Sequence, residues 1–175
     1  PPAEVTALRP DTGSSRGYYL QQGVAPYSGI FVYTGSTTPG VGVGDRVSLL
    51  GRYDRYYDSD QVVLVERVAH EPGTPSLGPV VVEPADIADA GALAAGLELM
   101  LVRVEGVRVS DPNPDAPADY DEFSLEGDLR VDDLLYPELT NDFGTGTELS
   151  SVSGVLGRSF DHFKLWPRGA GDVLF

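Results

Sequence analysis

The sequence predicts an all-β protein made of two five-stranded barrels joined by one connecting helix. Short apolar runs rich in β-branched and aromatic residues alternate with turns along the chain, which contains 21 glycines and 14 prolines. These runs fall into two sets that can be aligned with each other. Between the sets lies one alanine-rich segment with helical spacing.

The first set predicts a barrel within residues 1–70. Its strands are expected at residues 5–8, 17–21, 29–33, 46–50 and 62–68. Each run is short, rich in strand-forming residues and bounded by turn residues, which is the pattern of strands that are buried on one face.

A linker and a helix are expected within residues 71–97. The linker is EPGTPSLGP, residues 71–79, and the helix is PADIADAGALAAG, residues 84–96, with Pro84 at its start and Gly96 at its end. Its apolar side chains Ile87, Leu93 and Leu97 are expected to cap the second barrel.

The second set predicts a barrel within residues 98–175. Its strands are expected at residues 99–109, 122–125, 129–131, 149–156 and 163–166. The two halves align as follows: residues 46–64 with 149–167, residues 17–21 with 121–125, and residues 29–33 with 129–136. Gly51 then aligns with Gly154, and a glycine inside a strand marks a bulge or a close backbone approach. Two units of this size and strand number fit the OB-like Greek-key barrel, with a β-sandwich as the main alternative.

Four motifs resemble a known family. They are GYYLQ (residues 17–21), GIFVY (29–33), VGDRV (43–47) and ELMLVRV (98–104). Together they resemble the OB-fold region of secreted bacterial nucleases, in which a barrel precedes an exonuclease/endonuclease/phosphatase-type domain. The 175 residues leave no room for that domain. The resemblance therefore implies a tandem OB-fold accessory module of a secreted or periplasmic bacterial protein, without the nuclease domain and not itself an enzyme.

The composition restricts the partners. The chain carries 27 acidic and 12 basic residues, a net charge of −15, and residues 83–175 hold 19 of the acids and 6 of the bases. Such a surface repels nucleic-acid backbones unless a local basic patch offsets the field. There is no cysteine, so disulfides and thiolate metal sites are excluded. No apolar run approaches the ~20 residues of a membrane-spanning helix, and no membrane insertion is expected.

A ligand surface is expected on the first barrel, where tyrosine and arginine gather. Its candidate residues are Arg16, Tyr18, Tyr33, Arg52, Tyr53, Arg55, Tyr56 and Tyr57. OB barrels bind oligonucleotides or sugars across their second and third strands, and aromatic rings and arginines suit both ligands. Because alternate strand residues face the core, about half of these tyrosines are structural on strand geometry alone.

A calcium site is the second hypothesis. Asp111, Asn113, Asp115, Asp119 and Glu122 stand at positions 1, 3, 5, 9 and 12 of DPNPDAPADYDE, the spacing of calcium loops. Ala116 replaces the glycine expected at position 6, and the loop contains three prolines. A proline-rich acidic surface loop is the alternative explanation.

The sequence contains no recognised catalytic motif. We therefore expect a non-catalytic binding or scaffolding module whose ligand is single-stranded nucleic acid or a glycan. A protein–protein or surface-assembly domain, with calcium as a stabilising ion, is the alternative from another class. A cation-dependent hydrolase is the third.

Overall fold

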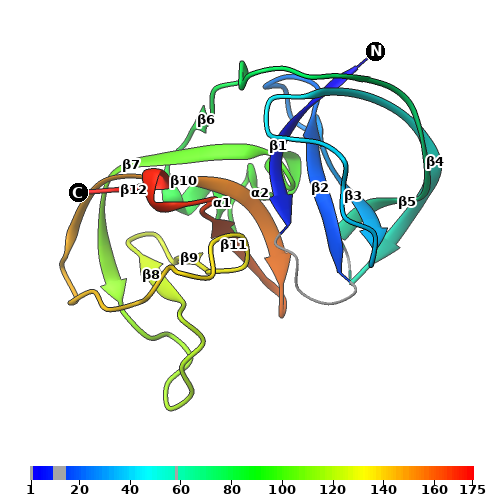
Figure 1. The fold of residues 1–175 in the computed structure, drawn as a ribbon. Helices are drawn as coiled ribbons and strands as arrows, with labels where there is room; N and C mark the ends of the chain where they lie inside the picture. Colours follow the sequence, from blue (N-terminus) through cyan, green and yellow to red (C-terminus); the bar gives the residue numbers. More distant parts are fainter. Residues whose placement is uncertain (1, 10–14, 58) are drawn as a thin grey trace.

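The computed structural model describes residues 2–9, 15–57 and 59–175, and within them it confirms the all-β prediction. The strands form two bodies, one from the N-terminal half and one from the C-terminal half (Figure 1). The ten predicted strands are all present, most of them longer than expected.

The N-terminal half is a closed five-stranded barrel. Its strands are β1 (Ala3–Arg9), β2 (Arg16–Gln21), β3 (Gly29–Gly35), β4 (Arg46–Tyr56) and β5 (Ser59–Glu71). They are ordered β1-β2-β3-β5-β4, with β3 and β5 parallel and the other neighbours antiparallel. The interior is filled by alternate side chains, including Val5, Leu20, Val32 and Val47.

The C-terminal half is a seven-stranded sheet that repeats this pairing. Its strands are β6 (Val80–Val81), β7 (Leu101–Asp111), β8 (Phe123–Leu125), β9 (Leu129–Val131), β10 (Glu148–Ser159), β11 (His162–Trp166) and β12 (Val173–Leu174). Five of them close a circuit, β7-β8-β9-β11-β10 and back to β7, in which β9 and β11 are again parallel. Strands β7 to β11 thus correspond to β1 to β5, as the internal repeat predicted. The short strands β6 and β12, which were not predicted, add to β7 and β10.

The two aligned glycines occupy the positions that the repeat assigned to them. In β4 the pairing with β5 shifts register between Leu50 and Arg52, so Gly51 lies in a β-bulge. In β10 a Cβ on Gly154 would lie 2.4 Å from the carbonyl oxygen of Trp166. The backbones therefore approach each other at a distance that only glycine permits.

The prediction of one helix over residues 84–96 was wrong. The segment forms two single-turn helices, α1 (Pro84–Ile87) and α2 (Ala94–Leu97). A tight turn separates them, in which a Cβ on Gly91 would lie 2.2 Å from the carbonyl oxygen of Asp86. Ile87 and Leu97 enter the core of the second barrel as expected, but Leu93 is 41% exposed because it lies in the turn.

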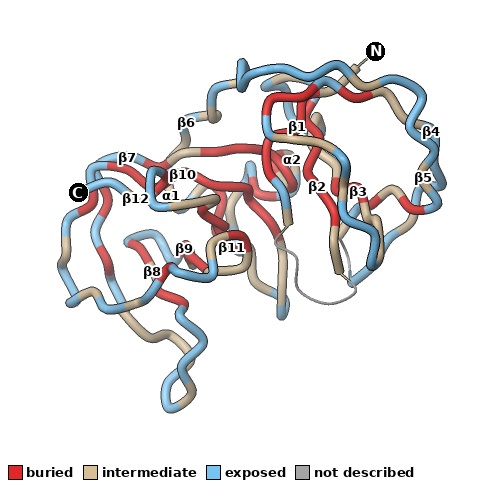
Figure 2. Tube along the Cα trace, viewed as in Figure 1, coloured by how far each residue is buried: buried red, intermediate tan, exposed pale blue. Residues whose placement is uncertain are grey.

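The largest core lies inside the second barrel, where the helices and the connection between β9 and β10 join the strands. In Figure 2, β10 is largely buried, whereas the outer parts of β4 and β5 are largely exposed. A 3₁₀ turn, η1 (Ala170–Asp172), precedes β12. Across the described residues, the helices are too short to cross a membrane.

Candidate binding surface

Strand β2 buries Tyr18, the tyrosine that was predicted for a ligand surface. Tyr18 is 3% exposed and belongs to the first barrel's core, whereas Tyr19 is 2% exposed and faces the opposite way. Burial raises the pKa of both phenol groups. Strand alternation turns Tyr18 into the barrel and away from an exposed surface, and its contact with a ligand stays a prediction.

The second barrel covers the β2–β3 face of the first. Tyr19 and Phe31, with ring centroids 4.9 Å apart, pack in one cluster with Leu99, Val155 and Trp166. The Tyr19 and Trp166 centroids are 6.3 Å apart. This is the face on which OB barrels bind oligonucleotides or sugars, and here it is an internal junction.

Two further predicted ligand residues, Arg16 and Tyr33, lie on β2 and β3. Tyr33 is half-buried and packs against the junction cluster. Arg16 donates hydrogen bonds to the carbonyl oxygen of Ser36 at 2.8 Å and to the hydroxyl of Thr38 at 2.9 Å. Arg16 therefore holds the loop that follows β3.

The remaining five candidates lie on the hairpin of β4 and β5, here called the β4–β5 ribbon (residues 46–71). They are Arg52, Tyr53, Arg55, Tyr56 and Tyr57, and all five are exposed. The pairing of the strands places Tyr53 and Arg55 on one face, with Asp60. Arg52 and Tyr56 lie on the other face, so the predicted cluster is divided between two surfaces.

The face of the β4–β5 ribbon that holds Tyr53 and Arg55 carries a polar contact. The Tyr53 hydroxyl donates to Asp60 Oδ1 at 2.7 Å, and Arg55 Nε lies 3.7 Å from the same oxygen. That hydrogen bond raises the pKa of Tyr53. At the hairpin end, the rings of Tyr56 and Tyr57 meet edge to face at 4.6 Å. Tyr57 is 84% exposed and forms the turn with a φ of 45°.

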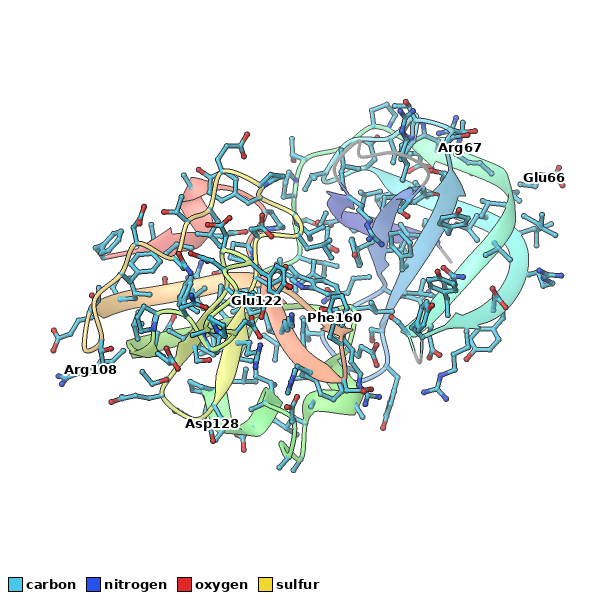
Figure 3. The ribbon with its side chains drawn as sticks, turned by 90° about the horizontal axis from the view of Figure 1, so that it is seen from below. Glu66, Arg67, Arg108, Glu122, Asp128 and Phe160 are labelled. Atoms are coloured by element: carbon cyan, nitrogen blue, oxygen red, sulfur yellow. The ribbon has the colours of Figure 1, made fainter. Side chains whose placement is uncertain are left out.

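Sequence reasoning missed three exposed aliphatic residues of the ribbon. Leu50, Leu64 and Val68 are 64%, 77% and 61% exposed. Leu50 pairs with Glu66, which points away from the protein in Figure 3. All three lie within the strands predicted at residues 46–50 and 62–68. The available signal was the presence of consecutive apolar residues there, because strand alternation turns every second one outward.

The edges of the ribbon are also available within the described part of the chain. Strand β1 pairs with β4 only at Arg46 and Val47, and β3 pairs with β5 only at Gln61 and Val62. In the second barrel, by contrast, β7 pairs with β10 from Glu148 to Val155. The β10 edge is therefore covered in the second barrel, whereas most of the equivalent β4 edge is open in the first.

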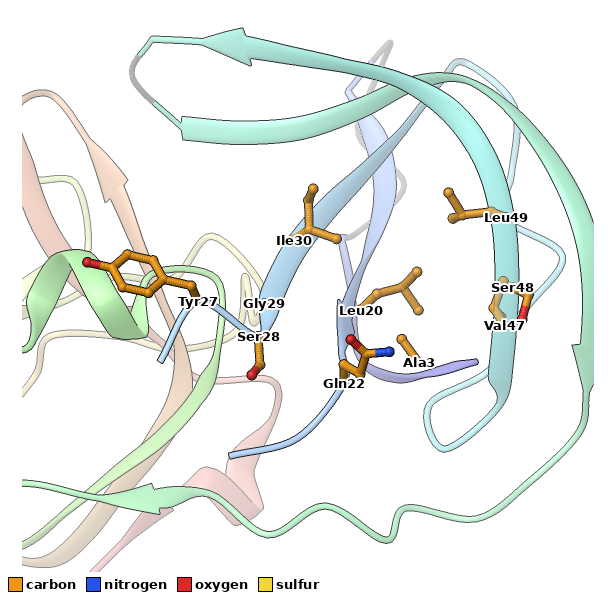
Figure 4. A pocket seen from close by; sticks show the side chains of 10 residues that line it. All are labelled: Ala3, Leu20, Gln22, Tyr27, Ser28, Gly29, Ile30, Val47, Ser48 and Leu49. Atoms are coloured by element: carbon orange, nitrogen blue, oxygen red, sulfur yellow. The ribbon is translucent and has the colours of Figure 1, made fainter. Parts of the chain in front are cut away.

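A hollow of about 390 Å³ opens at the base of the ribbon. Leu20, Ile30, Val47 and Leu49 point into it from β2, β3 and β4 (Figure 4). The connection between β3 and β4 contributes Val41 to the first core, whereas in the second barrel Ile87 and Leu97 from the helices add bulk to the core. The first barrel is consequently less completely filled at this end.

The acidic loop of residues 111–122 is held by contacts within the protein. Asp111 accepts a hydrogen bond from the Asn113 backbone N–H at 2.9 Å, and the Asn113 side chain donates to the Ala118 carbonyl at 3.0 Å. Asp119 accepts from the Asn141 side chain at 2.9 Å. These residues form local turns and a tie to the β9–β10 connection.

Basic side chains hold the other two predicted calcium ligands. Arg130 donates to Asp115 at 2.8 Å and to Glu122 at 3.1 Å, and Lys164 also bonds Glu122. In the described part of the chain, no three acidic, histidine or cysteine side chains converge on a point that could hold a metal. The loop is therefore organised around Arg130 and Lys164, and calcium binding stays a prediction.

Each histidine bonds to a carboxylate. His70 Nε2 lies 2.6 Å from Asp45 Oδ2, and Asp45 also accepts from the Gly42 and Gly73 backbones. These contacts, led by the Gly42 hydrogen bond and followed by that of His70, lower the pKa of Asp45 to about 2. His162 lies 2.6 Å from Asp89.

No protein-family model, curated protein or solved structure matches the chain. Function is therefore inferred from the geometry of the described residues.

Proposed function

We propose that the chain is a non-catalytic binding module of an extracellular bacterial protein, and that its β4–β5 ribbon binds a partner protein. The extracellular location and a role beside a nuclease rest on the motif resemblance given above. The binding role of the ribbon rests on its exposed apolar and aromatic side chains.

The observation that carries the proposal is the difference between two equivalent ribbons. Most of β10 is buried, yet the corresponding strand β4 exposes Leu50, Tyr53 and Tyr56. Leaving large apolar side chains in water has a cost of ~25 cal/mol per Å². A partner that covers the ribbon would remove that cost.

The ribbon's chemistry favours a protein over other ligands. Tyrosine and arginine are enriched where protein interfaces gain most of their binding energy. An open strand edge can accept an added strand, which only a polypeptide supplies. The positive charge of Arg55 is offset by Asp60, and the net charge of −15 further disfavours nucleic acid.

A glycan is a second candidate because of one feature, the edge-to-face pair of Tyr56 and Tyr57. Exposed aromatic rings can stack on sugars or bases, although here no cleft surrounds them. Titration with oligosaccharides and with single-stranded DNA, followed by tyrosine fluorescence, tests this candidate. Saturable quenching that Tyr56→Ala abolishes would favour it.

Site-specific photo-crosslinking tests the partner-protein proposal. A photo-reactive amino acid replaces Tyr57 in the cells that make the protein, and mass spectrometry identifies what is captured. The matched control places the same group at Phe160, the equivalent hairpin position, which is 90% exposed. We expect one defined partner at position 57 and not at 160. Equal capture at both positions would contradict the proposal.

A further inference from the structure

Lys164 is the only lysine among the 12 basic residues of the chain. It lies on β11 and is 1% exposed. Among the described residues, no arginine is buried to this extent. An ammonium group can give its proton to a neighbouring base, whereas a guanidinium keeps its proton in proteins. Of the 12 basic side chains, Lys164 is thus the one that can become a neutral amine.

Two buried carboxyl groups contact this amine. Lys164 Nζ lies 3.1 Å from Asp132 Oδ2 and also bonds Glu122 Oε1. Asp132 and Glu122 are 9% and 6% exposed. Figure 3 shows Glu122 in the middle of the second barrel, and the chain brings it to Lys164 from 42 residues away.

The backbone fixes Asp132 beside Lys164. The Asp132 N–H donates to the Leu165 carbonyl at 3.1 Å, which extends the parallel pairing of β9 and β11. Its second oxygen, Oδ1, accepts the Leu134 backbone N–H at 2.8 Å. That donor is placed where it would stabilise negative charge on Oδ1 during attack at the carboxyl carbon.

We propose that Lys164 and Asp132 condense into an intramolecular isopeptide bond, with Glu122 relaying a proton. The Lys164 ammonium gives a proton to the Asp132 carboxylate at Oδ2, and the free amine attacks Cγ of the resulting carboxyl. The Nζ–Cγ bond forms and Oδ1 carries the charge of the tetrahedral intermediate. Proton transfer from Nζ through Glu122 to Oδ2 releases one water. No oxidant or reductant is needed.

The surroundings favour this chemistry. Fixing amine and carboxyl in contact gives a high effective concentration, and a buried site excludes the water that would reverse the reaction. Burial raises the pKa of Glu122, and the hydrogen bond from Lys164 offsets part of that rise. Arg130 bonds the other Glu122 oxygen at 3.1 Å and so holds the carboxyl in place.

The bond would supply the covalent link that a chain without cysteine lacks. It would join β11 to the residue that follows β9, closing the one parallel contact of the second barrel's circuit. That contact has two residue pairs, Lys164 with Arg130 and Leu165 with Val131.

Mass spectrometry of the wild-type protein tests the inference without any variant. We expect an intact mass below that of the sequence by one water, and a tryptic product in which residues 131–158 are joined to residues 159–168. An intact mass equal to that of the sequence, with separate peptides, would overturn the proposal and leave a buried ion pair.

Variants then test the roles. Lys164→Arg keeps the charge and Glu122→Gln keeps the shape, and both are expected to restore the full mass. Asp115→Asn, which touches Arg130 but not Lys164, is the matched control and should retain the link. A link that persists in Glu122→Gln would refute the proton relay.

Discussion

Replacing Tyr19 with alanine tests whether the β2–β3 face is a junction between the barrels. The ring is 2% exposed and packs on Phe31 and near Trp166. A buried aromatic side chain removes ~150–250 Å² from water, which at ~25 cal/mol per Å² corresponds to ~4–6 kcal/mol as an upper limit. Aromatic-to-alanine changes in cores cost ~3–5 kcal/mol, so we expect a loss in that range for Tyr19→Ala.

Urea unfolding followed by fluorescence is the assay, since Trp166 is the only tryptophan and is 4% exposed at the same junction. Tyr57→Ala, on an 84% exposed ring, is the control and should change the free energy of unfolding by less than ~0.5 kcal/mol. Tyr19→Leu is a milder variant for which we expect ~1–3 kcal/mol. Equal, small losses for Tyr19→Ala and Tyr57→Ala would refute the junction.

Three further outcomes are expected. Because the pKa of Asp45 is lowered to about 2 from its ordinary 3.8, its contribution to stability is complete above pH 3.8 and is lost as pH falls toward 2. Asp45→Asn should therefore weaken the pH dependence of the unfolding free energy in that window. An unchanged pH dependence would show that Asp45 does not make this contribution. If the acidic loop binds calcium, millimolar calcium should raise Tm in the wild type and less in Asp119→Asn, whereas no rise rejects the calcium hypothesis. Gly154→Ala, whose Cβ would lie 2.4 Å from the Trp166 carbonyl, should cost ~1–3 kcal/mol in chemical denaturation. Gly23→Ala, with no atom within 4 Å, should be near neutral, and equal effects of the two would contradict the close approach.

The two barrels share one pairing order but use it differently. In the second, β10 pairs with β7 along most of its length and is buried. In the first, β4 leaves β1 after two residue pairs and extends with β5 into solvent. The two units thus share their topology, while one forms the larger packed core and the other has an exposed ribbon.

Much of the fold could be predicted because it depends on local patterns. Alternation of apolar residues located the ten main strands, and the aligned halves gave two equivalent units with matched glycines. The helix prediction was wrong because alanine spacing suggests one helix, while the close approach of Gly91 to the Asp86 carbonyl requires a turn. Strands β6 and β12 have two residues each, too few to form a pattern.

The candidate site could be predicted only in part. Sequence identified the tyrosine and arginine cluster but not its division between the two faces of the ribbon, which the bulge and the pairing register decide. From the sequence, Tyr18 was expected at a ligand surface. The direction of a strand side chain depends on which face the core or another barrel covers, and the sequence alone does not give that face. The contacts of Lys164 could not be predicted from sequence, since its two carboxyl partners lie 32 and 42 residues away along the chain.

The sequence by itself determined the strand content, the repeat and the acidic character, because backbone preferences and solvation act residue by residue. Only the tertiary structure decided which β faces are internal and which charged groups meet in the interior. Those outcomes depend on contacts between segments distant in the chain, whose geometry is set when the two barrels close and pack together.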